Sequence, residues 1–351
     1  MKREPSQTLG ESSVENERVD ASLQRAISLN YHFLRPASPS RFALRAHETP
    51  ERFDAQLAQM SKRFPFCRAG ELVDPTRGVP KSSVVITFDD GARDVVTWAL
   101  PLLEKHNATA SIFVCAQPYL EGRLLEIQKI EFLMKKLGIN GFRGAFYAEY
   151  ERVFGSEIER EPLDFAGGYT FYRYDDEDVR RFKIDLNYQI PYRKVTPILD
   201  ALFAGTFGAK SEADAVQETY LSIEDLKRLL DRGFELGVHT NRHCVLPRLD
   251  FEAQKREIEI GAAFLGDLTG QTEFTVAYPY GFHDENTHRA MRELGLRAGL
   301  TMERRAIGPQ DLRDRWSIPR YDVNDCFDRE SNQLLDPVFS QIAAGEPQAT
   351  G

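Results

Sequence analysis

The chain has 351 residues, of which 42% are hydrophobic and 28% are charged, with a net charge of −9. This composition is typical of an ordinary soluble globular protein, and the negative charge argues against a nucleic-acid-binding protein. No apolar run of about 18 residues predicts a membrane span. The four cysteines are scattered without a CxxC pair, and the N-terminus lacks the apolar core of a secretory signal. We therefore expect reduced thiols and a cytoplasmic location.

The first part of the chain predicts a tail, a strand and a helix. Residues 1–22 are polar and acidic, which predicts a disordered tail. Residues 26–32 read as a short strand that ends at His32. A helix is expected from about Thr49 to Met60, with the threonine as N-cap.

Residues 84–91 form an apolar, β-branched run that stops on Asp89, Asp90 and Gly91. The run predicts a buried strand of a parallel sheet. Two adjacent carboxylates resist ionising together, so each needs a cation, a donor or water nearby. The alternative is a solvated Asp-Gly turn.

A helix is expected over residues 94–106, bent at Pro101, followed by a strand over 109–114. This strand-helix-strand order predicts a parallel sheet with crossover helices. Residues 118–218 interrupt the rhythm with helical patterns and many Phe and Tyr residues. We favour a subdomain whose aromatic residues form its own small core, and the alternative is a lid offering aromatic faces to a sugar or acyl chain. The segment is expected to govern substrate choice rather than chemistry.

The alternation of helices and strands then resumes. Helices are expected over residues 222–230, 251–268 and 285–294, and strands over 234–239, 272–281, 298–301 and 316–323. The end, from about Gln333, reads as a helix and then a polar tail, with the tail taken as residues 336–351.

Two further signals follow strands. His239 and His243, at i and i+4, can converge on one metal ion if the chain turns after the strand. The alternative is one turn histidine and one solvated histidine. Thr240 stands where the zinc-protease HExxH pattern needs a glutamate. The second signal, residues 278–281 (Tyr-Pro-Tyr-Gly), is by itself a turn with aromatics.

Each of these signals directly follows an apolar strand, and this common position makes a shared functional site the favoured interpretation. The C-terminal ends of the strands of a parallel barrel share one face, so the side chains are expected to meet there. One carboxylate and two histidines form a facial set that leaves coordination positions open for water and substrate. A second carboxylate could take a proton from that water, and hydrolysis of an amide or ester needs these parts.

At these residues the sequence resembles the polysaccharide deacetylase superfamily (NodB homology, carbohydrate esterase family four). Residues 87–91 match its first motif and residues 239–243 its second, and the resemblance covers about 80–120 and 220–300. It implies an α/β fold: a deformed (β/α) barrel over residues 23–335, interrupted by the 118–218 insertion. It also implies that Asp89 is the catalytic base. The same resemblance assigns one divalent ion, expected to be zinc with cobalt or nickel as alternatives, to three ligands: Asp90, His239 and His243.

Further roles follow from the same resemblance. Tyr280 matches the residue whose backbone N–H binds the oxyanion. The arginine that usually pairs with the base is missing before Pro279, and Arg320 is a candidate substitute. The usual C-terminal catalytic histidine is also missing. Tyr31-His32 resembles an arrangement in the poly-N-acetylglucosamine deacetylases, which makes His32 a candidate acid; the alternative is a capping histidine.

The sequence thus predicts a metal-dependent carbohydrate N-deacetylase. Its expected partner is an acylated amino sugar of a glycan, glycolipid or sugar conjugate, and the oligomeric state stays open. Three alternatives remain: hydrolysis of another C–N bond such as a formamide or cyclic ureide, non-catalytic sugar binding, and a facial-triad iron oxygenase, in which Asp89 would have no role.

Overall fold

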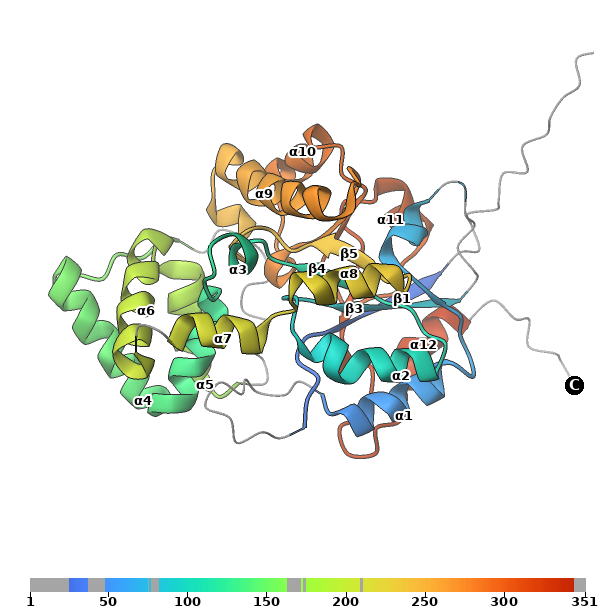
Figure 1. Cartoon of the computed structure of the whole chain (residues 1–351), viewed down its shortest axis with the longest axis horizontal. Helices are drawn as coiled ribbons and strands as arrows, with labels where there is room; N and C mark the ends of the chain where they lie inside the picture. The colour runs from blue at the N-terminus through green and yellow to red at the C-terminus, as the bar shows by residue number, and fades with distance from the viewer. Residues whose placement is uncertain are drawn as a thin grey trace, which may run out of the picture.

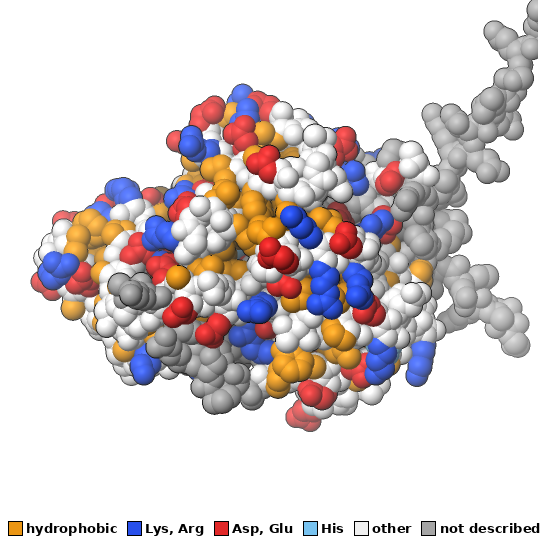
Figure 2. Space-filling view, in the orientation of Figure 1, with side chains coloured by type: hydrophobic (Ala, Val, Ile, Leu, Met, Phe, Trp, Pro, Cys, Tyr) orange, Lys and Arg blue, Asp and Glu red, His pale blue; other side chains and the backbone are white. Residues whose placement is uncertain are grey.

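The computed structural model describes residues 25–36, 48–74, 76, 82–162, 172, 175–208 and 211–343. Figure 1 shows a sheet flanked by helices on one side of the molecule and a separate group of helices on the other. The predicted tail at residues 1–22, and residues 344–351, lie outside the described ranges. On the face seen in Figure 2, Lys and Arg side chains are interspersed with Asp and Glu.

The sheet is built from parallel strands that pair in the order β7-β6-β5-β4-β3-β1-β8, with β2 beside β3. The strands are β1 Ala26–Tyr31, β2 Phe66–Cys67, β3 Ser83–Phe88, β4 Ser111–Val114, β5 Glu235–Val238, β6 Thr275–Ala277, β7 Ala298–Leu300 and β8 Tyr321–Asp322. β1 and β3 are buried along their whole length. Strands buried along their whole length require cover on both faces, as in a parallel α/β sheet.

A short segment around Pro319 links the two edges of the sheet. Ile318 forms a parallel bridge with Leu300 of β7, and Tyr321 pairs with Leu29 of β1. The sheet therefore curls into the deformed barrel expected from the sequence. The predicted strand over residues 316–323 is reduced to two residues of β8, because a proline has no N–H to donate to a strand ladder.

Helices flank the barrel (Figure 1). They are α1 Pro50–Met60, α2 Leu100–Lys105, α3 Gln117–Leu120, α8 Ile223–Asp231, α9 Phe251–Thr269, α10 Glu285–Glu293, α11 Pro309–Asp314 and α12 Asp336–Ala343. The predicted starts are confirmed where capping residues mark them: the Thr49 side chain accepts from the Arg52 N–H, and Ser222 forms a capping box with Asp225. The expected bend is present as a π turn over Val95–Ala99, after which Pro101 occupies the first turn of α2.

The C-terminal helix corrects one predicted boundary. Residues 336–343, taken as the start of a polar tail, form α12, and its Val338, Phe339 and Ile342 side chains are buried. Phe339 stacks on Phe64 with 5.6 Å between ring centroids. This apolar face, spaced at i, i+1 and i+4, belongs to the barrel core, so a polar tail can begin only after Ala343.

The insertion consists of α4 Glu126–Phe154, α5 Glu177–Ile184, α6 Tyr192–Phe207 and α7 Ser211–Thr219. α4 is kinked at Gly138, where φ is +69°. Four aromatic side chains, Phe142, Phe146, Tyr150 and Phe182, are buried in a cluster that belongs to the insertion alone. The favoured interpretation, a subdomain with its own aromatic core, is therefore confirmed for these residues. Residues 163–171 and 173–174 of the aromatic stretch lie outside the described residues.

Two whole-chain expectations can be compared with the described residues. None of the described helices combines the length and the apolar character needed to cross a membrane. The four cysteines are buried, and none of them forms a disulfide.

Candidate metal centre

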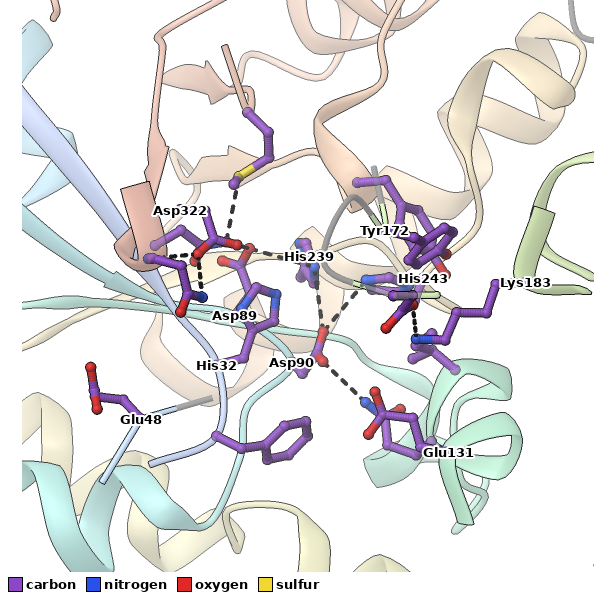
Figure 3. A pocket seen from close by; sticks show the side chains of 18 of the residues that line it. His32, Glu48, Asp89, Asp90, Glu131, Tyr172, Lys183, His239, His243 and Asp322 are labelled. Atoms are coloured by element: carbon purple, nitrogen blue, oxygen red, sulfur yellow. Dashed lines mark hydrogen bonds and ion pairs between the residues drawn. The ribbon is translucent and has the colours of Figure 1, made fainter. Parts of the chain in front are cut away.

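A pocket of about 580 Å³ lies at the carboxyl edge of the sheet, between the barrel and the insertion. Six of the residues predicted from the sequence line it: His32, Asp89, Asp90, His239, His243 and Tyr280 (Figure 3). They follow β1, β3, β5 and β6, so the strand ends meet as expected for a parallel barrel. The seventh, Arg320, is fully buried and contacts the pocket through Asp89.

Asp90, His239 and His243 form the centre of this pocket. Their ligand atoms all lie within 4.8 Å of one another. Asp90 Oδ1 is 3.6 Å from His239 Nε2 and 3.5 Å from His243 Nε2, and this buried oxygen has no hydrogen-bond partner. The three atoms face a common point at distances too long for good hydrogen bonds. Two imidazoles and one carboxylate are a donor set for a divalent ion, so these residues fit a metal site.

Unusual backbone conformations bring the three ligands together. Asp90, Thr240, His243 and Tyr280 are non-glycine residues with φ of +66°, +65°, +62° and +58°. Such conformations cost roughly 1–3 kcal/mol each and cluster at functional sites. The Thr240 hydroxyl accepts from the His243 N–H at 3.1 Å and closes the turn. The i, i+4 histidines therefore converge through a loop after β5, the condition that the sequence prediction required.

The two histidines are held in the form that binds metal ions. His239 Nδ1 lies 2.7 Å from the carbonyl oxygen of Ala277, which only accepts, so Nδ1 carries the proton and the Nε2 lone pair points to Asp90. Burial lowers the pKa of His239 and the pKa of His243 to about 4, so both are neutral near pH 7. Burial also raises the pKa of Asp90, and a bound cation would oppose that shift.

Asp89 is held by a buried arginine. Arg320 donates to both oxygens of Asp89, with Nη1–Oδ1 2.8 Å and Nη2–Oδ2 3.0 Å. Its Nε donates to the Thr301 carbonyl, and Nη1 also contacts the Thr87 hydroxyl at 3.2 Å. Burial alone would raise the pKa of Asp89, but Arg320, with a smaller contribution from His239, holds that pKa well below its usual range. The pairing predicted for Arg320 is therefore present, and Asp89 is ionised.

Comparisons with known proteins agree with this site. A family model described as polysaccharide deacetylase matches residues 76–132 and 202–299, which contain Asp89, Asp90, His239 and His243. The chain belongs to the polysaccharide deacetylase family. This family identity and the Asp-His-His centre make the protein a metal-dependent hydrolase of the carbohydrate esterase family four type. The unmatched residues 133–201 lie within the insertion predicted from the sequence.

One solved structure supports the fold of this deacetylase, and two others are similar over most of this chain. Streptococcus pyogenes deacetylase PplD, solved in complex with acetate, is 16% identical over 92% of this chain and 99% of its own, with a TM-score of 0.53. IcaB from Ammonifex degensii is 17% identical over 92% and 96%, with a TM-score of 0.49. BC0361, a polysaccharide deacetylase from Bacillus cereus, is 14% identical over 91% and 68%, also with 0.49. A search of curated proteins gave no match.

The remaining predicted residues of this deacetylase also lie at the pocket. His32 follows β1 beside Asp89 and Asp90 (Figure 3), and its charge favours the ionised form of both carboxylates. Tyr280 lies in the turn over Pro279–Gly281, and its ring packs edge-on to His243 with 4.7 Å between centroids. Their positions agree with the sequence analysis, and their roles as acid and oxyanion donor stay predictions.

Two residues that touch the site escaped the sequence analysis. Asn30 Nδ2 donates to Asp89 Oδ2 at 3.0 Å, and Gln128 Nε2 donates to Asp90 Oδ2 at 3.0 Å. Asn30 left a signal, since it is a polar residue inside an apolar strand, two positions before His32. Gln128 left none, because it lies on α4 in the insertion. The sequence analysis expected residues 118–218 to govern substrate choice rather than chemistry. That expectation needs correction, because Gln128 of this segment also donates a hydrogen bond to the candidate metal ligand Asp90.

Proposed function

We propose that this deacetylase removes an N-acetyl group from an amino sugar, with zinc as the expected ion. The observation that supports the proposal is that one pocket contains both a set of metal ligands and a separate ionised carboxylate. The Asp90 carboxylate and two neutral imidazoles face one point, and the ionised Asp89 lies directly beside them. Asp89 Oδ2 is 4.0 Å from His239 Nε2. Binding alone requires no such proton acceptor, and an iron oxygenase would leave it without a role.

Asp90, His239 and His243 would hold the divalent ion. When bound, such an ion polarises a carbonyl oxygen and lowers the pKa of water, which supplies the electrophile and the nucleophile of amide hydrolysis. Gln128 fixes the second oxygen of Asp90, and the Ala277 carbonyl fixes the His239 ring. Partners of this kind orient the ligands and raise metal affinity.

Asp89 would accept the proton of the attacking water. Arg320 and Asn30 occupy its two oxygens and set the orientation of the carboxylate. Its low pKa keeps it ionised at neutral pH, so it is ready to accept. The acceptance becomes favourable only where the water has itself been made acidic, because proton transfer depends on matched pKa values.

The leaving amine and the carbonyl oxygen require two further groups. An amine anion is too poor a leaving group near neutral pH, so the site needs an acid, and we assign His32, whose side chain lies at the same rim. The backbone N–H of Tyr280 is assigned to the oxyanion, where a fixed donor stabilises the charge that develops in the transition state.

The substrate we propose is an acylated amino sugar of a glycan, glycolipid or sugar conjugate. The pocket volume lies within the range of about 300–1,000 Å³ that is typical of small-molecule sites. We also propose that the protein acts in the cytoplasm; four unbridged cysteines are in keeping with a reducing compartment.

The proposal is tested by acetate and formate release, followed by mass spectrometry, across a panel of acylated amino sugars with added zinc, cobalt or nickel. We expect acetate and a free amino sugar from N-acetylated substrates, and no release after chelation. Formate release without acetate release would show the formamide-cleaving alternative instead. Metal-dependent binding of these sugars without any hydrolysis would overturn the proposed chemistry.

A further inference from the structure

One wall of the pocket comes from the insertion rather than the barrel. Gln128 and Glu131 reach it from α4, and Tyr172, Asp175 and Lys183 complete it (Figure 3). The residues that cut the amide come from the barrel rim. Apart from Gln128, which donates to Asp90, the residues of this wall have no assigned role in the chemistry, so the wall is a place to look for substrate selection.

Most carboxylates that line the pocket are already engaged. Their partners are as follows: Glu48 binds Arg52 at 2.8 Å, Asp89 binds Arg320, Asp90 accepts from Gln128, Asp175 binds Lys183 at 2.7 Å, and Asp322 accepts from Asn324 at 2.7 Å. An engaged carboxylate offers little to a ligand, because its lone pairs and its charge are already compensated.

Apart from Asp90, whose Oδ1 faces the two histidines of the metal centre, the exception among these carboxylates is Glu131. Its Oε2 is buried and has no hydrogen-bond partner. Burial raises the pKa of Glu131, and the charge of the Lys183 ammonium group offsets this only in part. A buried acceptor without a donor is unfavourable and rare in folded proteins. A donor carried by a ligand would complete this site.

The position of Glu131 relative to the reaction centre is fixed. It lies three residues after Gln128 on α4, and side chains at i and i+3 are neighbours on one helix face. Gln128 in turn donates to the metal ligand Asp90. Figure 3 shows the Glu131 carboxylate on the Asp90 side of the pocket. A sugar whose acyl group sits at Asp90 would therefore place its neighbouring ring groups next to Glu131.

We propose that Glu131 is a specificity-determining residue that accepts a hydrogen bond from a hydroxyl or ammonium group beside the acylated nitrogen. The deacetylase then selects neutral or cationic amino sugars and rejects those that carry a carboxylate or phosphate at that position. This inference rests on the proposed function. It deepens that function by adding the charge class of the substrate.

The test compares two disaccharides: one of N-acetylglucosamine only, and one in which N-acetylmuramic acid replaces the unit to be deacetylated and so adds a lactyl ether that carries a carboxylate beside the acylated nitrogen. The full chain is loaded with zinc, and kcat/KM for acetate release and affinity by calorimetry are measured. We expect the wild type to prefer the neutral sugar by about tenfold or more, the usual scale of a hydrogen bond to a charged group. Glu131→Gln should reduce this preference to about twofold, mainly through KM, and Glu131→Lys should reverse it.

The matched control is Glu151→Gln, the same change at an exposed position of α4, which should leave the preference as in the wild type. Zinc stoichiometry and the hydrolysis of an aryl acetate should stay unchanged in Glu131→Gln. An unchanged preference in Glu131→Gln, or loss of zinc from it, would overturn the inference. If the wild type hydrolyses neither sugar, the proposed function fails. The calorimetric affinities then test the role of Glu131. Tighter binding of the neutral sugar by the wild type, lost in Glu131→Gln, supports the inference, and equal binding of the two sugars by the wild type refutes it.

Discussion

Asp89 and Asp90 are neighbours in the chain but have different surroundings. Arg320 grips Asp89 with two hydrogen bonds and holds its pKa well below the usual range, whereas burial raises the pKa of Asp90, one oxygen of which faces only the two histidines. Titratable groups whose pKa values are pushed apart by their environments commonly divide the roles of a reaction between them.

The first prediction separates the two roles by substitution. Asp89→Asn should keep the metal and lose about 10²–10⁴-fold in kcat, the usual contribution of a general base. Asp90→Asn and His239→Ala should lose both the metal and the activity. Metal content by elemental analysis and acetate release are measured on the same samples. Roles are reversed if Asp89→Asn proves to be the variant without metal.

The second prediction concerns His32. His32→Ala should leave metal content and thermal stability unchanged and should slow the hydrolysis of an amide strongly. It should slow an aryl acetate much less, because a phenolate leaves without a proton. Equal rate losses on amide and ester would indicate a structural or oxyanion role, and no loss on either would remove this histidine from the mechanism.

Among the elements, α4 has two functions, since its first half packs on the barrel and also supports the metal centre. Gln128 connects Asp90 to Tyr220, whose hydroxyl donates to the Oε1 of Gln128 at 3.0 Å.

The third prediction is that Gln128→Ala weakens metal binding about 10–100-fold, as expected when a partner of a ligand is lost. Competition with a coloured chelator measures the affinity. Lys136→Ala, on the exposed side of the same helix, is the control; an equal loss there would attribute the effect to α4 in general.

The turn after β6 and helix α10 meet at two histidines. His288 Nε2 lies 2.9 Å from His283 Nδ1, so one shared proton satisfies both nitrogens. Burial, with a contribution from His288, lowers the pKa of His283 to about 4. The unfolded chain binds a proton near pH 6.5, before the folded chain does, so folding stability is complete above that pH and is lost as pH falls toward 4.

The fourth prediction is that the free energy of unfolding falls on the order of 2 kcal/mol more in the wild type than in His283→Gln between pH 7.5 and pH 4.5. Urea unfolding at the two pH values measures it, with metal absent from both samples. Parallel pH dependence in the two proteins would show that His283 does not carry this effect.

The strand-end residues were predictable from the sequence because each one directly follows an apolar run that predicts a buried strand. Asp89, Asp90, His239 and Tyr280 each follow an apolar run, and a parallel sheet brings such ends together. Arg320 was predicted only because the arginine that the family usually places before Pro279 is missing, which called for a substitute. That it pairs with Asp89 could be seen only in the structure. Gln128 and Glu131 could not be predicted, since no periodicity shows which turn of an inserted helix will lie over a pocket.

At the scale of the whole molecule, the barrel and the insertion share a core. Phe33, Ala92 and Cys115 of the barrel pack against Leu125 and Phe132 of the insertion. This contact argues against a barrel that folds unaided.

The fifth prediction is that replacing residues 118–218 by a short loop destabilises the protein, because each large apolar side chain removed from a core is worth about 1.5–3 kcal/mol. Thermal unfolding, dye binding to exposed apolar surface and metal content are measured. A trimmed protein with the original melting temperature and metal content would show that the barrel stands alone.

The barrel closes through residues 318–321, and the same residues carry Arg320 to Asp89, 231 positions earlier in the chain. During synthesis, the chain therefore makes Asp89 long before the arginine that neutralises its charge. Until residues 318–321 have left the ribosome, Asp89 lacks its partner and the sheet retains open edges that can pair with other chains. Contacts of such long sequence separation slow folding. The step that pairs Asp89 with Arg320 is thus also the step that removes the open edge, and neither can occur early.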